Sequence, residues 1–393
     1  MANDTIKFKL QQVLSDKNSK GKERPWREHK YHSIVLSKSF RRIYRVKHSI
    51  FRRKDKINYS RRADRAEMCG TSLGFVFENN RLKLAHAKFC NISLCPMCAW
   101  RKSRRISHNV SLVTSALQDE GYRLIMATFT VKNVSGQDLK AQLSELTKSF
   151  NKMTCYKQFK ASVKGYFRAL EITHDTKEYI TKSMYENSKA YYDKMGLSAG
   201  DKNPNFGMYH PHFHVLLAVN KSYFDDKRYY IKQGDFAKMW QRALKANYTP
   251  VVDVRAIKGS RKDINEVAKY TTKSGDYLVG ERDEFTRMLV TVDEPLTDSA
   301  VEVLSEALHK RRLVGWGGVF DEMRKRLNIE EEVEAAADAV DDEQPVKLNF
   351  RWFGVGFNNY KLTQIFKDGE NLEEIEVEVK QEKLEATKKY SSV

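Results

Sequence analysis

The pattern of apolar and polar positions along the chain predicts a series of strands and helices. Alternating or β-branched runs predict four strands, over residues 123–131, 166–173, 210–219 and 250–257. Apolar residues three and four positions apart predict one helix over 139–153 and a second near 236–246. Strands and helices in this order, with antiparallel connections between them, predict an α+β fold in which helices cover a sheet.

The run over 210–219 carries two histidines, His212 and His214, on one side of its alternating pattern. Successive strand residues point to opposite faces, so Phe213 and Val215 enter a core while both imidazoles project from the other face. Two such side chains can hold one divalent ion. The alternative is that one histidine is packed in the core and the others lie in a polar loop.

Residues 263–275 form a helical pattern with two distinct faces. Ile264, Val267, Ala268 and Thr271 gather on one side, and Glu266, Tyr270 and Lys273 gather on nearly the opposite side. A tyrosine beside a metal can attack a phosphodiester, a lysine can stabilise the charge that develops, and a carboxylate can accept a proton. The alternative is a solvated helix face with ordinary capping and ion pairs.

Four of the five cysteines lie between residues 69 and 98, namely Cys69, Cys90, Cys95 and Cys98. The Cys-x2-Cys spacing of the last pair lets both thiolates reach one tetrahedral Zn²⁺, and the first two complete a closed structural site. His86 or His108 can replace one sulfur, and a redox-active pair is a further alternative. Residues 101–105, Arg-Lys-Ser-Arg-Arg, follow directly and predict a basic helix suited to a phosphate backbone.

The chain carries a formal net charge of +19 at pH 7 over its 393 residues. A surplus of this size favours a polyanionic partner, either nucleic acid or an anionic membrane surface. The membrane is disfavoured because no apolar run approaches the roughly 20 residues that span a bilayer. The absence of a signal-peptide stretch and the sparse cysteines predict a cytoplasmic protein.

The first 68 residues are dense in basic residues, with aromatic side chains interleaved at 40–45 and 51–54. Arginine binds phosphate and aromatic rings stack on bases, so this region is expected to contact DNA. The alternative is a solvated basic arm without a defined site.

Together these motifs resemble the rolling-circle replication initiators of bacterial plasmids, which belong to the two-histidine (HUH) endonuclease superfamily. The resemblance covers roughly residues 69–320, and the motifs occur in the family's order. Residues 128–133 are similar to its first motif, 210–214 to its metal-binding motif and 266–273 to its third. The cysteine cluster is typical of the plasmid branch that uses a single tyrosine.

The resemblance implies an HUH-type antiparallel central sheet flanked by helices, and an enzyme that nicks and rejoins origin DNA. Tyr270 would form a covalent 5′-phosphotyrosine and release a 3′ hydroxyl. His212 and His214 would bind Mg²⁺ or Mn²⁺, with Glu171 as the third ligand because it points away from the apolar face of its strand. Glu266 would activate water for termination; Tyr277 is a conceivable second tyrosine.

The expected organisation is a basic DNA-contacting region over 1–68, a zinc element over 69–110, the nicking and joining domain over 111–320, and an acidic linker with a C-terminal module over 321–393. The implied partners are the plasmid double-strand origin, single-stranded DNA at the nick, a host helicase and DNA polymerase, and a second copy of the chain in a homodimer. Two other functions are considered. One is a sequence-specific DNA-binding protein without catalysis and with structural metal sites; the other is a metal-dependent hydrolase without a covalent step.

Overall fold

A computed structural model of the chain describes residues 4–50, 57–78, 81–257, 276–331, 334–336 and 346–379. The chain divides into two compact units, and each unit is assembled from separate stretches of sequence. Unit 1 comprises residues 1–31, 67–90 and 336–393. Unit 2 comprises residues 32–66 and 91–335.

Unit 2 is built on a five-stranded antiparallel sheet with strand order β7-β4-β6-β5-β8. The long strand β6 lies at its centre and is buried along nearly its whole length. The strands are β4 (Arg123–Thr130), β5 (Val163–His174), β6 (Tyr209–Val219), β7 (Val252–Ala256) and β8 (Val314–Gly318).

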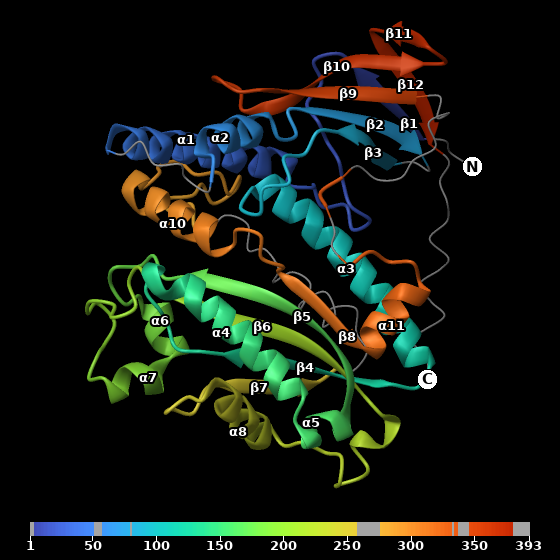
Figure 1. Cartoon of the computed structure of the whole chain (residues 1–393). Coiled ribbons are helices and arrows are strands. Elements are labelled where there is room, and N and C mark those ends of the chain that lie inside the picture. Colours follow the sequence, from blue (N-terminus) through green and yellow to red (C-terminus); the bar gives the residue numbers. More distant parts are fainter. Residues whose placement is uncertain are drawn as a thin grey trace. The chain divides into compact units, whose positions relative to one another are not determined.

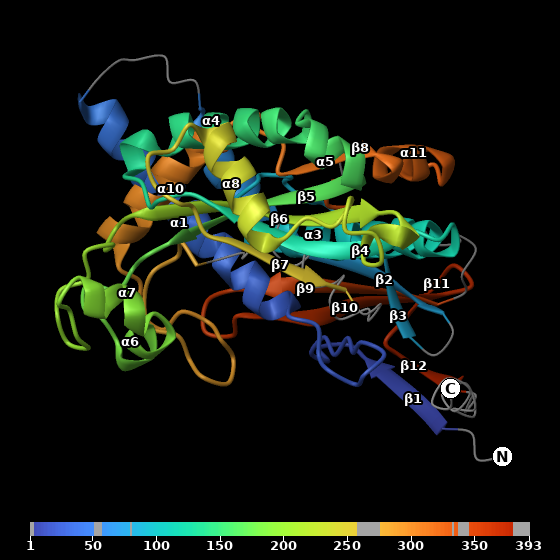
Figure 2. The same ribbon diagram turned by 90° about the horizontal axis from the view of Figure 1, so that it is seen from below.

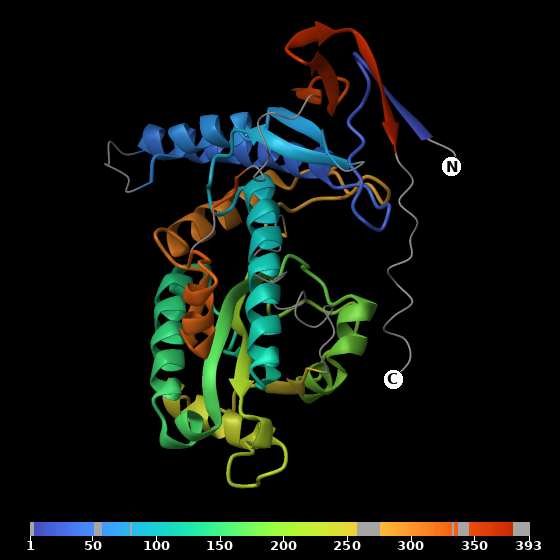
Figure 3. The ribbon, with the colours of Figure 1, turned by 90° about the vertical axis from the view of Figure 1, so that its right-hand side faces the viewer.

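Helices cover both faces of this sheet, and Figure 3 shows α3 and α4 on opposite sides of it. The helices that lie wholly in unit 2 are α3 (Pro96–Asp119), α4 (Gly136–Thr154), α5 (Lys157–Ser162), α6 (Lys182–Asn187), α7 (Lys189–Lys194), the 3₁₀ turn η1 (Lys221–Tyr223), α8 (Gln233–Leu244), α10 (Glu294–Ala307) and α11 (Val319–Arg326). Two further helices, α1 (Trp26–Ile50) and α2 (Tyr59–Met68), contribute residues to both units.

Helix α4 shows how the sequence specifies these elements. Ser135 caps the helix by accepting a hydrogen bond from the backbone N–H of Asp138. The apolar residues at spacings of three and four form one stripe, and all of them are buried: Leu139, Leu143, Leu146, Phe150 and Met153. The stripe packs on the sheet, where the ring of Phe150 contacts that of Phe213 at a centroid distance of 5.5 Å.

The two faces of the sheet have different cores. On the face covered by α3 and α11 the core is mainly aliphatic, with Val110 and Leu117 packed against Leu216 and Ala218 of β6. On the face covered by α4 and α8 it is mainly aromatic, with Phe129 against Phe150 and Trp240. Alternation along β6 assigns Phe213 to the aromatic face, whereas His212 and His214 share the face of Leu216.

Strand β8 contains the glycine-rich segment 315–318. Tyr166 of β5 lies directly opposite Gly317, and a Cβ atom at Gly317 would lie 2.5 Å from the Tyr166 ring. The guanidinium of Arg168 passes 3.0 Å from the corresponding Cβ position of Gly315. Glycine therefore leaves room for two large side chains of the neighbouring strand.

Unit 1 contains a second five-stranded antiparallel sheet with strand order β11-β10-β9-β2-β3, and a separate ribbon formed by β1 and β12. Figures 1 and 2 show β2 and β9 side by side, although about 270 residues of sequence separate them. The strands are β1 (Asp4–Lys9), β2 (Ser72–Glu78), β3 (Arg81–Ala87), β9 (Val346–Phe353), β10 (Asn359–Lys367), β11 (Glu370–Leu372) and β12 (Glu374–Val379).

These observations confirm the predicted α+β class with an antiparallel sheet flanked by helices. The segment over 176–206 contains the short helices α6 and α7. Strand β9 covers part of the aromatic run near residue 350 and pairs with β2 and β10, so this run lies within the sheet of unit 1. Among the described helices, none has the length and hydropathy needed to cross a membrane.

Gly317→Ala is expected to lower the free energy of unfolding by about 1–3 kcal/mol, because the new methyl group overpacks the Tyr166 ring. Tyr166 cannot easily move, since its ring already contacts Phe150 at 5.0 Å. Thermal unfolding monitored by circular dichroism measures the effect. Gly234→Ala, in α8 with open space around it, is the control and should leave the melting temperature unchanged or slightly raised.

Candidate functional site

Strand pairing in unit 2 brings three ligand-type side chains together. In the antiparallel register of β5 and β6, Glu171 lies directly opposite His212, and on the other side of β6 Thr128 lies opposite His214. Residues opposite each other share a face. Glu171, His212 and His214 therefore all project from the face that carries the aliphatic core, just beyond that core.

The three side chains converge at short distances. Oε2 of Glu171 lies 3.1 Å from Nε2 of His212 and 2.8 Å from Nε2 of His214, and the two Nε2 atoms are 3.1 Å apart. All three residues are buried, with exposed fractions of 3%, 8% and 8%. We call this group the Glu-His-His triad.

The triad fits a divalent metal ion. Ligand atoms about 2.1 Å from a metal and at right angles to each other are about 3 Å apart, which matches the three observed separations. One carboxylate with two imidazoles is a donor set that divalent first-row metals accept. The group is one of two in the described residues with enough nearby ligand atoms to hold a metal.

The other ring nitrogens of the two histidines are held by neighbouring oxygen atoms. Nδ1 of His212 lies 3.2 Å from the carbonyl oxygen of His210, and Nδ1 of His214 lies 3.2 Å from Oγ1 of Thr128. An Nδ1–H that donates to each oxygen leaves the Nε2 lone pair facing the triad. These contacts orient both rings for metal binding.

His210 continues the histidine row toward the start of β6. Burial, helped by the nearby His212, lowers the pKa of His210 to about 4, so its ring is neutral at pH 7. His174 is the last residue of β5 and Tyr209 is the first residue of β6. Their rings lie on the opposite face of the sheet from His210 and stack with centroids 4.5 Å apart. Burial lowers the pKa of His174 and raises that of Tyr209. Sequence patterns gave no signal for this stacked pair.

A cavity of about 1100 Å³ opens beside His174. Its lining includes Lys177 and Arg282 as well as the acidic residues Asp276, Glu281 and Asp293. None of the triad residues lines it. The cavity and the triad are therefore separate features of unit 2.

The proposed nucleophile and its two neighbours, Tyr270, Glu266 and Lys273, lie outside the described residues. Their position opposite the histidines stays a prediction. Tyr277, the conceivable second tyrosine, is buried and donates its hydroxyl hydrogen to the carbonyl oxygen of Leu94. In this position it is held in the protein interior, so it does not present a hydroxyl group to DNA.

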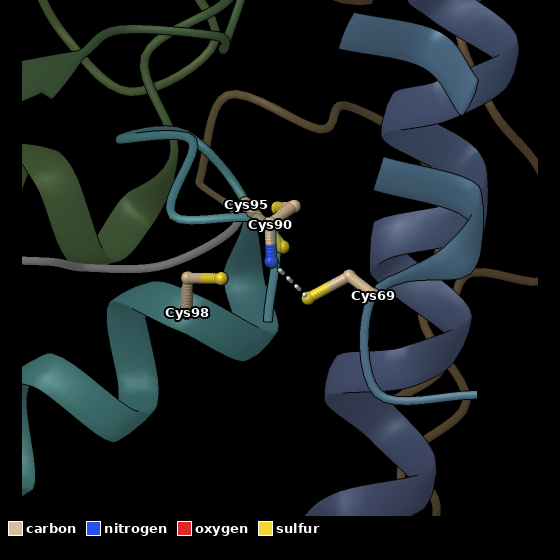
Figure 4. A group of neighbouring side chains, drawn as sticks. All are labelled: Cys69, Cys90, Cys95 and Cys98. Atoms are coloured by element: carbon tan, nitrogen blue, oxygen red, sulfur yellow. Dashed lines mark hydrogen bonds between the residues drawn. The ribbon is translucent and has the colours of Figure 1, made fainter. Parts of the chain in front are cut away.

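The four cysteines form the second group that can hold a metal. Their sulfur atoms all lie within 4.8 Å of one another, every residue is buried, and Figure 4 shows the thiols directed toward a common centre. Backbone N–H groups point at two of them, from Cys90 to Sγ of Cys69 at 3.4 Å and from Asn91 to Sγ of Cys98 at 3.2 Å. Neither His86 nor His108 belongs to the group in the described part of the chain.

Several cations of the basic N-terminal region are engaged within the protein. Arg42 forms ion pairs with Asp298 and Glu294 at 2.7 and 2.8 Å, and the hydrogen bond to Asp298 raises the pKa of Arg42. Phe40, one of the interleaved aromatic residues, is fully buried. The aromatic run at 51–54 lies outside the described residues. Phe40 and Arg42 therefore stabilise unit 2, and DNA contact by this region stays a prediction.

Comparison with known proteins identifies the family to which this chain is similar. Residues 81–353 match the family model described as Replication protein. A "Protein rep" of Bacillus amyloliquefaciens is 36% identical over 338 residues, which cover 81% of this chain and 86% of that protein. A "Protein rep" of Streptococcus pneumoniae serotype 2 is 32% identical over 326 residues, which cover 81% of this chain and 84% of that protein.

A third relative, "Protein rep" of a Bacillus species, is 37% identical over 292 residues, which cover 69% of this chain and 82% of that protein. No solved structure matches the chain. The residues that match the family model include the triad and also strands β3 and β9 of the sheet in unit 1. The resemblance to plasmid replication proteins is thereby confirmed at the level of the family, and the chain belongs to the Replication protein family.

Proposed function

We propose that this protein initiates plasmid rolling-circle replication by nicking and rejoining origin DNA through a covalent 5′-phosphotyrosine. The observation that carries the proposal is the buried, convergent Glu-His-His triad in a member of the Replication protein family. The net charge of +19 supports a polyanionic substrate.

The triad would hold Mg²⁺ or Mn²⁺, which when bound polarises the scissile phosphodiester as a Lewis acid. The Tyr270 hydroxyl loses its proton to solvent, its phenolate oxygen forms a bond to phosphorus, and the bond from phosphorus to the 3′ oxygen breaks. The departing oxygen takes up a proton and becomes the 3′ hydroxyl that a polymerase extends. Lys273 stabilises the negative charge on the phenolate and the phosphoryl oxygens.

Termination needs a second cleavage by a different nucleophile. Glu266 is proposed to accept a proton from water, which then attacks the second phosphodiester. The leaving 3′ oxygen takes up a proton as in the first step. The 3′ hydroxyl that this second cleavage releases then attacks the phosphorus of the phosphotyrosine, the bond from phosphorus to the Tyr270 oxygen breaks, and Tyr270 takes up a proton as the strand is joined. Together these roles make the chain a site-specific endonuclease and strand transferase that needs only one catalytic tyrosine.

The cysteine group is proposed to bind a structural Zn²⁺, since four buried thiols with N–H groups directed at the sulfurs match a closed tetrahedral site. The functional division into a basic region, a zinc element, a nicking domain and a C-terminal module also remains our proposal. We likewise propose a host helicase and a DNA polymerase as partners, a homodimer and a cytoplasmic location.

Tyr270→Phe is expected to abolish the covalent adduct, because the variant lacks the attacking oxygen. The wild-type protein is incubated with end-labelled single-stranded origin DNA and Mn²⁺, and the products are separated under denaturing conditions. Tyr277→Phe is the matched control and should still form the adduct, since Tyr277 is buried. A labelled adduct in Tyr270→Phe, or none in the wild-type protein with any divalent metal, would refute the mechanism.

His214→Ala is expected to lower the affinity for Mn²⁺ by at least 100-fold, because it removes a ligand and leaves Glu171 partly uncompensated. Electron paramagnetic resonance counts free and bound Mn²⁺ without DNA, so the readout does not depend on nicking. Thr128→Val removes only the oxygen near Nδ1 of His214 and should weaken binding about tenfold.

His108→Ala, an exposed histidine of α3, is the control for that series and should bind Mn²⁺ as the wild-type protein does. Equal Mn²⁺ affinity in His214→Ala and the wild-type protein would remove the triad from the mechanism.

Cys98→Ser is expected to lose bound zinc and to melt at a lower temperature, because a structural zinc site contributes directly to folding free energy. Elemental analysis of the purified protein gives the zinc content per chain. Cys155→Ser is the matched control, since Cys155 is exposed and outside the group. A metal-free wild-type protein whose melting temperature does not respond to chelators would contradict the zinc assignment.

A further inference from the structure

We propose that the outer face of the sheet in unit 1 binds single-stranded DNA. We define the outer face as the side of strands β2, β3, β9 and β10 that points away from the buried core of this sheet. The inference goes beyond the proposed nicking reaction, because it concerns a separate unit and needs neither the triad nor a tyrosine nucleophile.

The two faces of this sheet differ sharply in composition. Along β9, residues alternate between buried Leu348, Phe350 and Trp352 and the outward Asn349 and Arg351. The buried face packs on the aromatic ring of Trp26, which contacts Phe75 edge to face. The outer face is therefore the one left to interact with a partner.

The outer face is basic. Strands β2, β3, β9 and β10 contain one acidic residue, Glu78, which is paired with Lys83 at 2.9 Å. The outer face of these strands carries five lysines and arginines, namely Arg81, Lys83, Lys347, Arg351 and Lys361. Arg351 and Lys361 lie in one row across the sheet with Ser72. Neither cation forms an ion pair with a described acidic residue, so both charges remain available to phosphate groups.

Exposed apolar side chains stand next to these cations. The hairpin between β9 and β10 presents Phe353, which is 39% exposed, and Phe357, which is 36% exposed, with the fully exposed Val355 between them. The ammonium of Lys361 lies 5.6 Å from the ring centroid of Phe353 and 4.2 Å from that of Phe357. Solvent-facing rings with cations beside them provide stacking surfaces for unpaired bases.

The face also carries a cavity. In the neighbouring row, His86, Gly74 and Asn349 lie opposite one another. The Oδ1 atom of Asn349 and the Cβ atom of His86 lie 3.0 and 3.3 Å from the position that a Cβ atom of Gly74 would take, so both side chains pack closely over this glycine. A cavity of about 560 Å³ lies here, and its lining includes Lys88, Arg351 and Phe353. This size falls within the range of about 300–1,000 Å³ found for small-ligand sites, and the cations, amides and aromatic ring around it match a nucleotide.

The shape favours a single strand over a duplex. Four strands about 4.8 Å apart span about 14 Å between their outermost backbones, and side chains widen the face further. The major groove of a duplex is about 12 Å wide, so this sheet does not enter it. Bases reach Phe353 and the cavity that it lines only when they are unpaired. Single-stranded DNA is therefore the partner that fits.

The test uses the full-length protein, EDTA and a fluorescein-labelled single-stranded oligonucleotide of mixed sequence, about 20 nucleotides long so that it spans more than one typical site. Because no divalent metal is present, failure of the nicking mechanism leaves this measurement unaffected. Fluorescence anisotropy gives the affinity at a series of salt concentrations. The same series with a duplex of that sequence compares the two forms of DNA.

Phe353→Ala is expected to weaken single-strand affinity about tenfold, and Phe353→Trp to restore it, because stacking needs an aromatic ring. The double variant Lys88→Ala with Arg351→Ala should reduce the slope of log affinity against log salt by about 1.4, since two phosphate contacts are lost. Arg123→Ala, an exposed arginine of β4 in unit 2, is the control and should leave affinity and slope unchanged.

Unchanged affinity and salt slope in the double variant, with an unaltered melting temperature, would overturn the proposal. So would equal losses for single-stranded and duplex DNA, since these would show that the face binds the backbone of a duplex. Loss of affinity in Phe353→Trp as large as in Phe353→Ala would also count against base stacking.

Discussion

The register between β5 and β6 is the constraint on which the candidate site depends. It sets Glu171 against His212 and, through the alternation of β6, against His214 as well. A carboxylate as buried as Glu171 is costly unless it is compensated by charge or hydrogen bonds. A slip of one residue would turn it to the opposite face, among the rings of Phe150 and Phe213. The two imidazoles thus compensate the buried carboxylate, and the strand register that brings the three groups together is strongly specified.

The rest of unit 2 supports this register from both sides. The aliphatic face leads directly into the triad, so α3 and α11 protect the same face from water. The aromatic face anchors β6 to α4 through Phe150 and Phe213. At the edge of the sheet, β8 contributes glycines that let the side chains of Tyr166 and Arg168 lie flat. Oxygen atoms from His210 and Thr128 then fix the two imidazole rings, so the site is preorganised by the sheet itself.

Unit 1 has a different physical character. Its sheet buries one face, and the other face carries cations beside the exposed rings of Phe353 and Phe357 at the β9–β10 hairpin. Unit 2 keeps His212, His214 and Glu171 buried, and packing holds their ligand atoms in place. One unit is therefore suited to precise chemistry at a single point, and the other to many weak contacts along a polyanion. A replication protein that handles a DNA strand can use both properties.

The sequence by itself determined strands β4 to β7 and helices α4 and α8 of unit 2, the ligand residues of the triad and the four cysteines of the second group. Such features follow from local patterns. Alternation with a period of two assigned His212, His214 and Glu171 to particular faces of their strands, and the Cys-x2-Cys spacing indicated thiols that can bind one metal ion together. Only the tertiary structure decided that β5 and β6 are neighbours, that the triad is buried, and that residues 72–87 join residues 346–372 in one sheet. Strand order and pairing over hundreds of residues depend on which surfaces pack together, and a local pattern carries no information about that choice. The outer face of unit 1 could not be predicted for the same reason, since Lys88, which follows β3, comes near Arg351 and Phe353 of β9 only when the sheet forms.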